Sequence, residues 1–436
     1  MRIPAHQWPW RWCLYWLLLP NIIVIVMWPI GGPPMGRPIF VAGLLALAFS
    51  QMRSLLLRRM AVAVLGLGIT FEYIVNSFNL EAMRIDAASE FLKNAKPLAS
   101  AEYLAGLVIL CATLALAVRG AGRVQHFARP SNWIFAICAI LGMMQIDAVA
   151  TVATSNTYKG LPPEGTPFAS GVESGGVAQP GPARRHLVVI VVEALGIPTF
   201  EEGKRLFAAD WDRPAWRGRY EVARGKVAYF GSTTNGEIRE LCGAFANFDG
   251  FDFAHADCLP RRYSKAGYDT LAIHAFEGGF FDRRAWWPQA GFARTEFAPD
   301  LVRGGARKCG GMWPGACDVD IAAQIGQRLK SASRPQFIYW VTLNSHIPVL
   351  AGATPGLAGC EDGAAPLAHA SLLQCRLFQA HHDIAEAISA LAMDPALPPT
   401  DFLIVGDHMP PFMRRNERLD FDGYNVPWIV LRNRPA

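Results

Sequence analysis

Three apolar runs in the second half of the chain each end in side chains that can bind a metal ion or transfer a proton. The first run stops at Glu193, the second ends near His346, and the third ends in Asp407 and His408. Two carboxylates and an imidazole are suitable ligands for Zn²⁺ or Mn²⁺. If the runs are parallel strands of one sheet, these residues meet at one rim, and we expect a single metal site there.

A fourth ligand can come from the segment GSTTNGE, residues 231–237, which offers hydroxyl groups at the predicted start of a helix. Free N–H groups and the positive end of the helix dipole favour an anionic partner at such a position. Taken alone, the segment is explained by an ordinary helix cap. Beside a metal ion, one of its threonine hydroxyls would become an activated nucleophile.

The loop FEGGFFDRRAWWPQAGF, residues 276–292, combines aromatic side chains with the adjacent Arg283 and Arg284. Aromatic rings and guanidinium groups together suit an anionic, partly organic ligand such as a phosphate head group. The alternative is a domain surface near a bilayer, with Trp286 and Trp287 at head-group depth.

The elements that must position these residues follow from the pattern of apolar residues. The uninterrupted run LVVIVVEALG, residues 187–196, predicts a strand buried on both faces of a parallel sheet. Helical and strand-like segments alternate after it, which favours an α/β domain with a mainly parallel central sheet. We expect a helix over 375–392, on which His381 and His382 are structural or exposed, and a final edge strand at VPWIVL, residues 426–431.

The first part of the chain has the composition of a membrane domain. We predict five transmembrane helices, over residues 12–30, 38–52, 60–78, 102–118 and 132–152, of which the second is short. The expected organisation is a five-helix transmembrane domain (1–153), a linker rich in Gly, Pro and Ser (154–186) and a catalytic domain (187–436). Glu72 and Asn76 share one face of the third helix and are either functional or an interhelical hydrogen-bonding pair.

Basic residues set the expected orientation in the membrane. The two loops that would face the cytoplasm carry arginines at positions 53, 58 and 59 and at positions 119, 123 and 129. An odd number of spans then places the C-terminal domain outside. Of the nine cysteines, six follow Glu193 in three local pairs, which favours disulfides and an oxidising compartment over zinc binding, since no CxxC spacing is present. The net charge of +5 gives little support for nucleic-acid binding.

The motifs VVIVVEALG, GSTTNGE, FFDRR, LNSHIP and VGDHMPP occur in this order and span nearly all of the external half. The chain resembles the membrane-anchored branch of the alkaline-phosphatase/sulfatase superfamily, which includes lipoteichoic acid synthases and lipid A phosphoethanolamine transferases. The six external cysteines resemble the phosphoethanolamine enzymes, whereas LNSHIP is closer to the synthase form.

This resemblance implies one divalent metal, Zn²⁺ or Mn²⁺, with four ligands: Glu193, Thr233, Asp407 and His408. Thr233 lies where the family's nucleophile lies and would form a covalent phosphothreonine; the adjacent Thr234 is the alternative nucleophile.

Further positions match the family's substrate-binding residues. Arg283 and His346 match positions that hold the phosphate and assist proton transfer, and Phe281 of FFDRR falls in the same substrate-binding region. The sulfatase signature Cys/Ser-x-Pro-x-Arg is absent around Thr233, which argues against cleavage of sulfate esters.

The expected function is a metal-dependent membrane phosphotransferase. It would move phosphoethanolamine or phosphoglycerol from a phospholipid donor to an envelope glycan or lipid acceptor. We expect a monomeric, multi-pass protein of the bacterial inner membrane whose catalytic domain faces the periplasm. The alternatives are a phosphodiesterase or sulfatase-like hydrolase with the same metal site, and a non-catalytic membrane scaffold. Proximity in the sequence suggests the disulfides Cys242–Cys258, Cys309–Cys317 and Cys360–Cys375.

Overall fold

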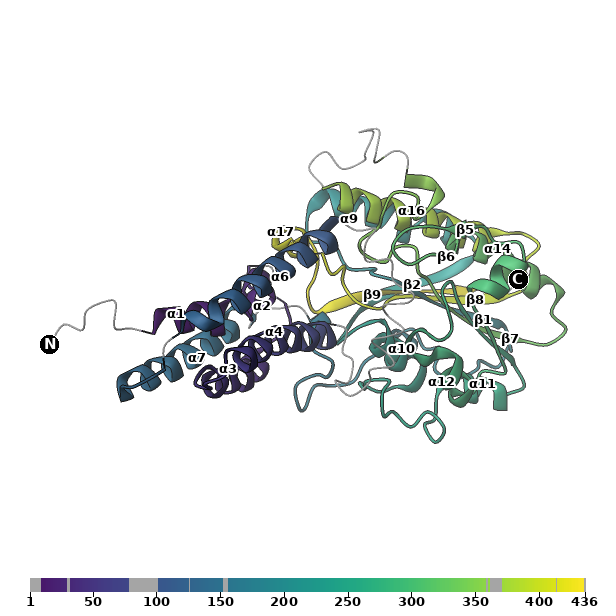
Figure 1. Ribbon diagram of the computed structural model, residues 1–436. Coiled ribbons are helices and arrows are strands. Elements are labelled where there is room, and N and C mark those ends of the chain that lie inside the picture. The colour runs from purple at the N-terminus through teal and green to yellow at the C-terminus, as the bar shows by residue number, and fades with distance from the viewer. Residues whose placement is uncertain are drawn as a thin grey trace. The chain divides into compact units, whose positions relative to one another are not determined.

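The computed structural model describes residues 9–29, 32–77, 101–124, 126–151, 156–357, 360, 371–412 and 414–434 (Figure 1). The chain divides into two compact units. The first comprises Met1–Met83 and Ala101–Thr154, and the second comprises Arg84–Ser100 and Ser155–Ala436. Each unit is considered by itself below.

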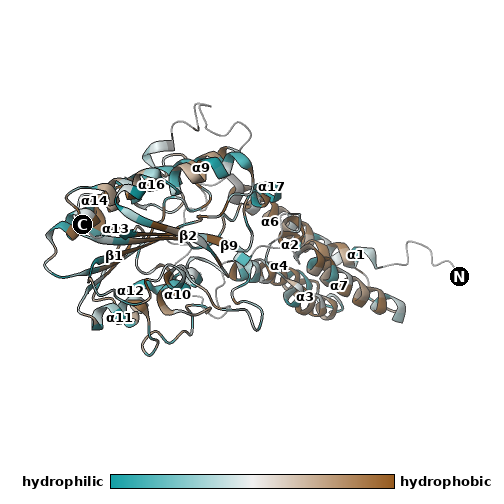
Figure 2. Cartoon of the chain, turned by 180° about the vertical axis from the view of Figure 1, so that it is seen from behind, coloured by the Kyte–Doolittle hydropathy of each residue, from teal (hydrophilic) through white to brown (hydrophobic). Residues whose placement is uncertain are grey.

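The first unit is a set of apolar helices, a composition that indicates a membrane protein (Figure 2). Among the described residues, three helices are long and apolar enough to cross a bilayer: Leu55–Ser77, Leu104–Arg123 and Pro130–Thr151. A fourth apolar helix, α3 (Gly36–Ser50), has only 15 residues. Large apolar side chains on the long helices are exposed, including Leu56 at 67% and Val149 at 66%, as expected for contact with lipid.

The predicted first span is not one regular helix. It is divided into α1 (Trp10–Trp12), the π-helical segment Cys13–Leu18 and α2 (Ile22–Met27). The break surrounds Pro20, which lacks the N–H group that a continuous helix needs. The count of five spans is therefore not confirmed. Asn76 donates a hydrogen bond to the carbonyl of Glu72 within its own helix, which accounts for that amide without a functional site.

The second unit is built on a seven-stranded sheet with the order β2-β9-β8-β1-β7-β3-β4. The strands are β1 (His186–Val192), β2 (Tyr220–Ala228), β3 (Asp269–His274), β4 (Arg294–Glu296), β7 (Gln336–Val341), β8 (Thr400–Gly406) and β9 (Asn425–Asn433). The pairs β8–β1, β1–β7, β7–β3 and β3–β4 are parallel, whereas β9 is antiparallel to both neighbours. The predicted mainly parallel sheet is confirmed.

Helices cover both faces of this sheet (Figures 1 and 2). One face carries α10 (Thr233–Cys242), α11 (Leu259–Lys265) and α12 (Arg283–Ala290), and the other carries α9 (Glu201–Trp211), α14 (Asp318–Ser331) and α16 (Leu372–Met393). Shorter elements are α8 (Gly171–Ser174), α13 (Ala298–Arg303), α17 (Arg415–Leu419) and the hairpin of β5 (Lys308–Cys309) and β6 (Gly315–Ala316). Because both faces are covered, central strand β1 is buried along almost its whole length.

One predicted strand has a different place in the sheet. The segment VPWIVL lies in β9, which is an interior strand between β8 and β2, so the prediction of an edge strand is wrong. The edge strands are β2 and β4. Five of the nine residues of β2 are exposed, and its charged residues interrupt any apolar run. Three disulfides join Cys242 to Cys258, Cys309 to Cys317 and Cys360 to Cys375, as proximity in the sequence suggested.

Candidate active site

The register of the parallel strands brings the first two acidic residues together. Val192, the last residue of β1, pairs with Gly406, the last residue of β8. The next residues, Glu193 and Asp407, therefore leave the sheet at the same level, and His408 follows directly. Their candidate ligand atoms, one from each side chain, all lie within 4.8 Å of one another, and all three residues are buried.

Two buried oxygen atoms in this group have no hydrogen-bond partner among the described residues: Oε1 of Glu193 and Oδ2 of Asp407. The Nε2 atom of His408 lies 3.5 Å from the first and 3.4 Å from the second. The other ring nitrogen, Nδ1, is 2.9 Å from the carbonyl of Met409, so Nδ1 carries a hydrogen, and in the neutral ring Nε2 offers its lone pair to a cation. Unpaired buried carboxylate oxygens are costly, and this donor set fits a divalent cation.

The charges of the group act on one another. Burial and the neighbouring Glu193 raise the pKa of Asp407 to about 6. Burial lowers the pKa of His408, but Asp407 and Glu193 outweigh that effect and the net shift is upward. A buried acid whose pKa is raised by a second carboxylate, as for Asp407, is expected where a cation is to be bound.

Thr233 lies beside these groups and Thr234 does not. Thr233 is the first residue of α10, and its hydroxyl donates to Glu193 Oε2 at 3.0 Å and lies 3.4 Å from His408 Nε2. The hydroxyl of the buried Thr234 instead lies 3.2 Å from that of Ser232. This arrangement depends on the turn before α10, where Gly231 has φ +78° and the Asn235 side chain accepts from Ser232 N–H.

His346 lies in the turn that follows β7. Its Nδ1 is 2.9 Å from the carbonyl of Ile347 and its ring lies 5.2 Å from that of Trp313. Burial and the neighbouring His408 lower the pKa of His346 to about 4. The turn is held by Asp318, at the start of α14, which accepts from the N–H groups of Leu343 and Asn344 at 2.8 and 2.7 Å.

Arg283 is committed to a protein partner. Its guanidinium group forms an ion pair with Glu237 of α10, with Nη2 at 2.7 Å from Oε1, and both side chains are almost fully buried. Phe281 is half-buried and lies 5.5 Å from this guanidinium. Trp287 donates to Glu237 Oε2 at 3.0 Å, and both Trp286 and Trp287 are buried. The alternative of a tryptophan surface at head-group depth is therefore wrong.

Two residues next to the site were not predicted. Arg239 of α10 donates to the carbonyl of Gly406 at 2.8 Å and is paired with Glu240, so it holds the end of β8 that carries Asp407. His381 of α16 is buried, with Nε2 at 3.0 Å from the carbonyl of Glu193. His382 instead lies 2.7 Å from the carboxylate of Asp210. Neither contact has a local sequence signal, because the partners are more than 160 residues apart.

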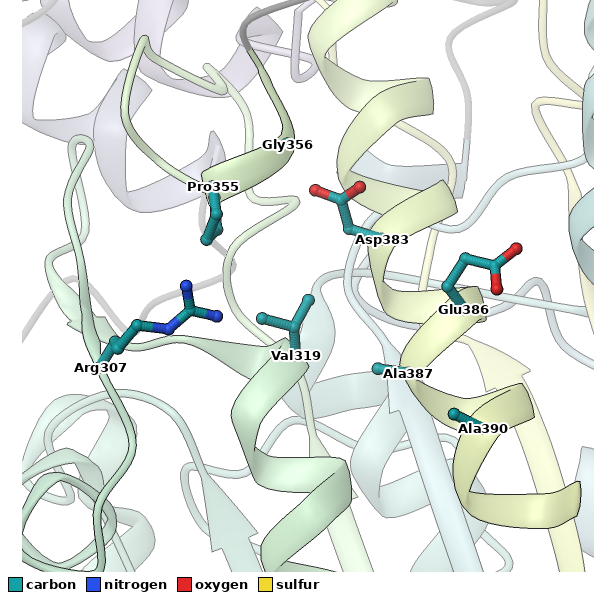
Figure 3. A pocket seen from close by; sticks show the side chains of 8 residues that line it. All are labelled: Arg307, Val319, Pro355, Gly356, Asp383, Glu386, Ala387 and Ala390. Carbon is teal, nitrogen blue, oxygen red and sulfur yellow. The ribbon is translucent and has the colours of Figure 1, made fainter. Parts of the chain in front are cut away.

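A separate cavity of about 530 Å³ lies between α14, α16 and the segment around Pro355 (Figure 3). Arg307 reaches into it from one side and Asp383 and Glu386 line the other. Arg307 is paired with Asp320, and Glu386 with Arg213. This cavity contains none of the predicted site residues.

The chain is similar to several solved structures. The lipoteichoic acid synthase LtaP from Listeria monocytogenes is 14% identical. The alignment covers 58% of this chain and 66% of the LtaP chain, with a TM-score of 0.41. The phosphoglycerol transferase GacH from Streptococcus pyogenes, in complex with sn-glycerol-1-phosphate, is 14% identical over 60% of this chain and 71% of its own, with a TM-score of 0.41. The periplasmic domain of EcEptC from Escherichia coli, in complex with Zn, is 16% identical over 57% and 73%, with a TM-score of 0.40.

This chain spans just under two thirds of the length of the LtaP chain. No curated protein matches it. The family model of the sulfatases matches residues 216–434, half of the chain. The matched segment contains Thr233, His346, Asp407 and His408, while Glu193 lies ahead of it. The chain therefore belongs to the sulfatase family.

Proposed function

We propose that this protein is a metal-dependent membrane phosphotransferase. It takes a phosphate-bearing head group, phosphoethanolamine or phosphoglycerol, from a phospholipid and passes it through Thr233 to an envelope glycan or lipid. The observation that carries this proposal is the position of the Thr233 hydroxyl. It lies at the start of α10, 3.0 Å from Glu193 Oε2, beside two unpaired buried carboxylate oxygens.

The cation would be held by Glu193, Thr233, Asp407 and His408. When bound, a divalent ion lowers the pKa of a coordinated hydroxyl and neutralises phosphate charge. The hydrogen of the Thr233 hydroxyl already points to Glu193 Oε2, which is the direction in which the proton leaves. The N-terminal N–H groups of the ten-residue helix α10 favour an incoming phosphate.

The reaction has two balanced steps. Thr233 Oγ1 loses its proton toward Glu193 Oε2 and attacks the phosphorus atom. The bond to the diacylglycerol oxygen breaks, and that oxygen takes up one proton, which balances the proton lost by Thr233. An acceptor hydroxyl then attacks the same phosphorus atom, the bond to Thr233 breaks, Thr233 Oγ1 takes up a proton to regenerate its hydroxyl, and the acceptor proton must be removed. His346 suits this last task, because a pKa of about 4 keeps it neutral and its Nδ1–H faces the Ile347 carbonyl, leaving Nε2 as the acceptor.

The cellular setting belongs to the same proposal. The protein works as a monomer in a bacterial inner membrane, with five membrane-spanning segments and the catalytic unit in the periplasm. Three disulfides in the catalytic unit support an oxidising compartment. The arginines at positions 53, 58, 59, 119, 123 and 129, which lie at or next to the ends of membrane helices, support the orientation.

Trapping the covalent intermediate tests this function. The full chain in detergent is mixed with vesicles containing phosphatidylethanolamine or phosphatidylglycerol, without acceptor, and its intact mass is measured. We expect an added head-group phosphate in the wild type and in Thr234→Ala, and none in Thr233→Ala or after chelation. An adduct that persists in Thr233→Ala overturns the mechanism. When an acceptor glycan or lipid is added in a second step, release of free phosphoalcohol without a modified acceptor would instead identify a hydrolase.

A further inference from the structure

One backbone residue next to the candidate metal site has an unfavourable conformation. Ala194 directly follows Glu193 and has φ +56°, in the left-handed region of backbone conformation that residues other than glycine rarely occupy. Ala194 is fully buried, so solvent does not stabilise this turn. Such a conformation persists only where the surrounding contacts hold it in place.

The peptide group between Glu193 and Ala194 is held at both ends. Its carbonyl oxygen accepts from the Ser345 hydroxyl at 2.7 Å and lies 3.0 Å from His381 Nε2. Because a carbonyl only accepts, the hydrogen of the His381 ring must be on Nε2. The N–H group of Ala194 donates to Asp407 Oδ1 at 2.9 Å.

These contacts decide which oxygen atoms face the cation site. Oδ1 of Asp407 is occupied by the N–H groups of Ala194 and His408, which leaves Oδ2 unpaired. The same turn directs the side chain of Glu193 so that its Oε1 is also unpaired and buried. His381 does not belong to the group of candidate ligand residues, and the Ser345 hydroxyl donates to the carbonyl of Glu193 instead.

We propose that His381 and Ser345 are positioning residues that hold the Glu193–Ala194 peptide in its left-handed turn and so set the affinity of the site for a divalent ion. This inference rests on the proposed function only in requiring that the site binds such an ion. The two residues come from different elements, α16 and the turn after β7, and they converge on one carbonyl oxygen. Partners behind metal ligands typically change metal affinity about 10- to 100-fold when they are removed.

The test measures ion affinity without any lipid. The full chain in detergent is freed of metal with a chelator and titrated with Zn²⁺ and with Mn²⁺ by calorimetry. His381→Leu should weaken binding by about 10-fold or more, whereas His381→Gln, which keeps a donor near the same place, should stay close to the wild type. The matched control is His382→Leu on the same helix, since His382 contacts Asp210 instead.

Ala194→Gly provides the readout that a merely structural role would not move. Glycine adopts the left-handed turn without strain, so this change should restore much of the affinity lost in His381→Leu. Wild-type affinity in His381→Leu, equal loss in His382→Leu, or no rescue by Ala194→Gly overturns the inference. If His381→Leu does not fold, the same comparison is made with Ser345→Ala.

Failure of this inference and failure of the proposed function give different results. If the wild type binds the ion but transfers no head group, and His381→Leu binds the ion more weakly, only the proposed function is contradicted. A wild type that transfers a head group but keeps its ion affinity in His381→Leu contradicts only the inference. A wild type that binds no divalent ion contradicts both.

Discussion

The pair of Arg283 and Glu237 allows a sharp test of whether Arg283 acts on the substrate or on the fold. The guanidinium lies 2.7 Å from Glu237 Oε1, and the exposed fractions of the two side chains are 2% and 0%. Arg283→Met would leave a buried carboxylate with only the Trp287 N–H as a partner. Removing one member of a buried ion pair typically costs about 3–5 kcal/mol.

For a domain of this size, that loss corresponds to an unfolding temperature lower by on the order of 10 °C. The loss should also depend on pH. Burial raises the pKa of Glu237 even beside Arg283, and without Arg283 the pKa rises further. A raised carboxyl pKa means that stability is lost as pH increases, so the destabilisation should be larger at pH 8 than at pH 5.

Thermal unfolding of the metal-free protein, followed by circular dichroism, measures the effect. The matched control is Arg284→Met, because Arg284 is exposed and lies over the ring of Phe297. We expect Arg283→Met/Glu237→Gln to recover most of the lost stability, since no unpaired charge then remains. If Arg283→Met unfolds like the wild type but abolishes head-group transfer, this reasoning is wrong and Arg283 binds the substrate phosphate.

Three further predictions concern the surroundings of the site. Burial raises the pKa of Asp318 to about 7, so its bound proton contributes stability that is present below about pH 4 and is lost as the pH rises through 7. Asp318→Asn should therefore flatten the unfolding free energy between those values, and an unchanged slope in urea titrations would contradict this. Gly236→Ala places a methyl group 3.2 Å from Asp407 Cα. This contact should displace Asp407, so we expect calorimetry to show weaker ion binding, although alanine favours the helix more than glycine does. A variant that is more stable and binds the ion with normal affinity would refute this prediction. Cys242→Ser with Cys258→Ser removes a bridge with a sequence separation of 16 and should cost about 3 kcal/mol. In thermal unfolding, reductant should then lower the unfolding temperature of the variant less than that of the wild type, because only the other two disulfides remain to be reduced.

The predicted strands succeeded where burial on both faces leaves an unbroken apolar run. Strands β1, β7 and β8 are of this kind, and the residues at their ends, Glu193 and Asp407, were found because parallel strands end at one rim. Strand β2 was missed because its exposed polar residues carry no such run. The predicted edge position of β9 was wrong, because a short apolar strand has the same sequence pattern at an edge and in the interior of a sheet.

The sequence by itself determined the apolar helices, the mainly parallel sheet and the residue types at the strand ends. These properties follow from composition and periodicity over short stretches. Tertiary structure alone decided that Arg283 pairs with Glu237, that Thr233 rather than Thr234 faces Glu193, and that His381 contacts the Glu193 carbonyl. Each of these contacts joins residues that are 40 or more positions apart. A hydrogen bond depends on distances of a few tenths of an ångström, which strand register and helix packing set and which no local pattern encodes.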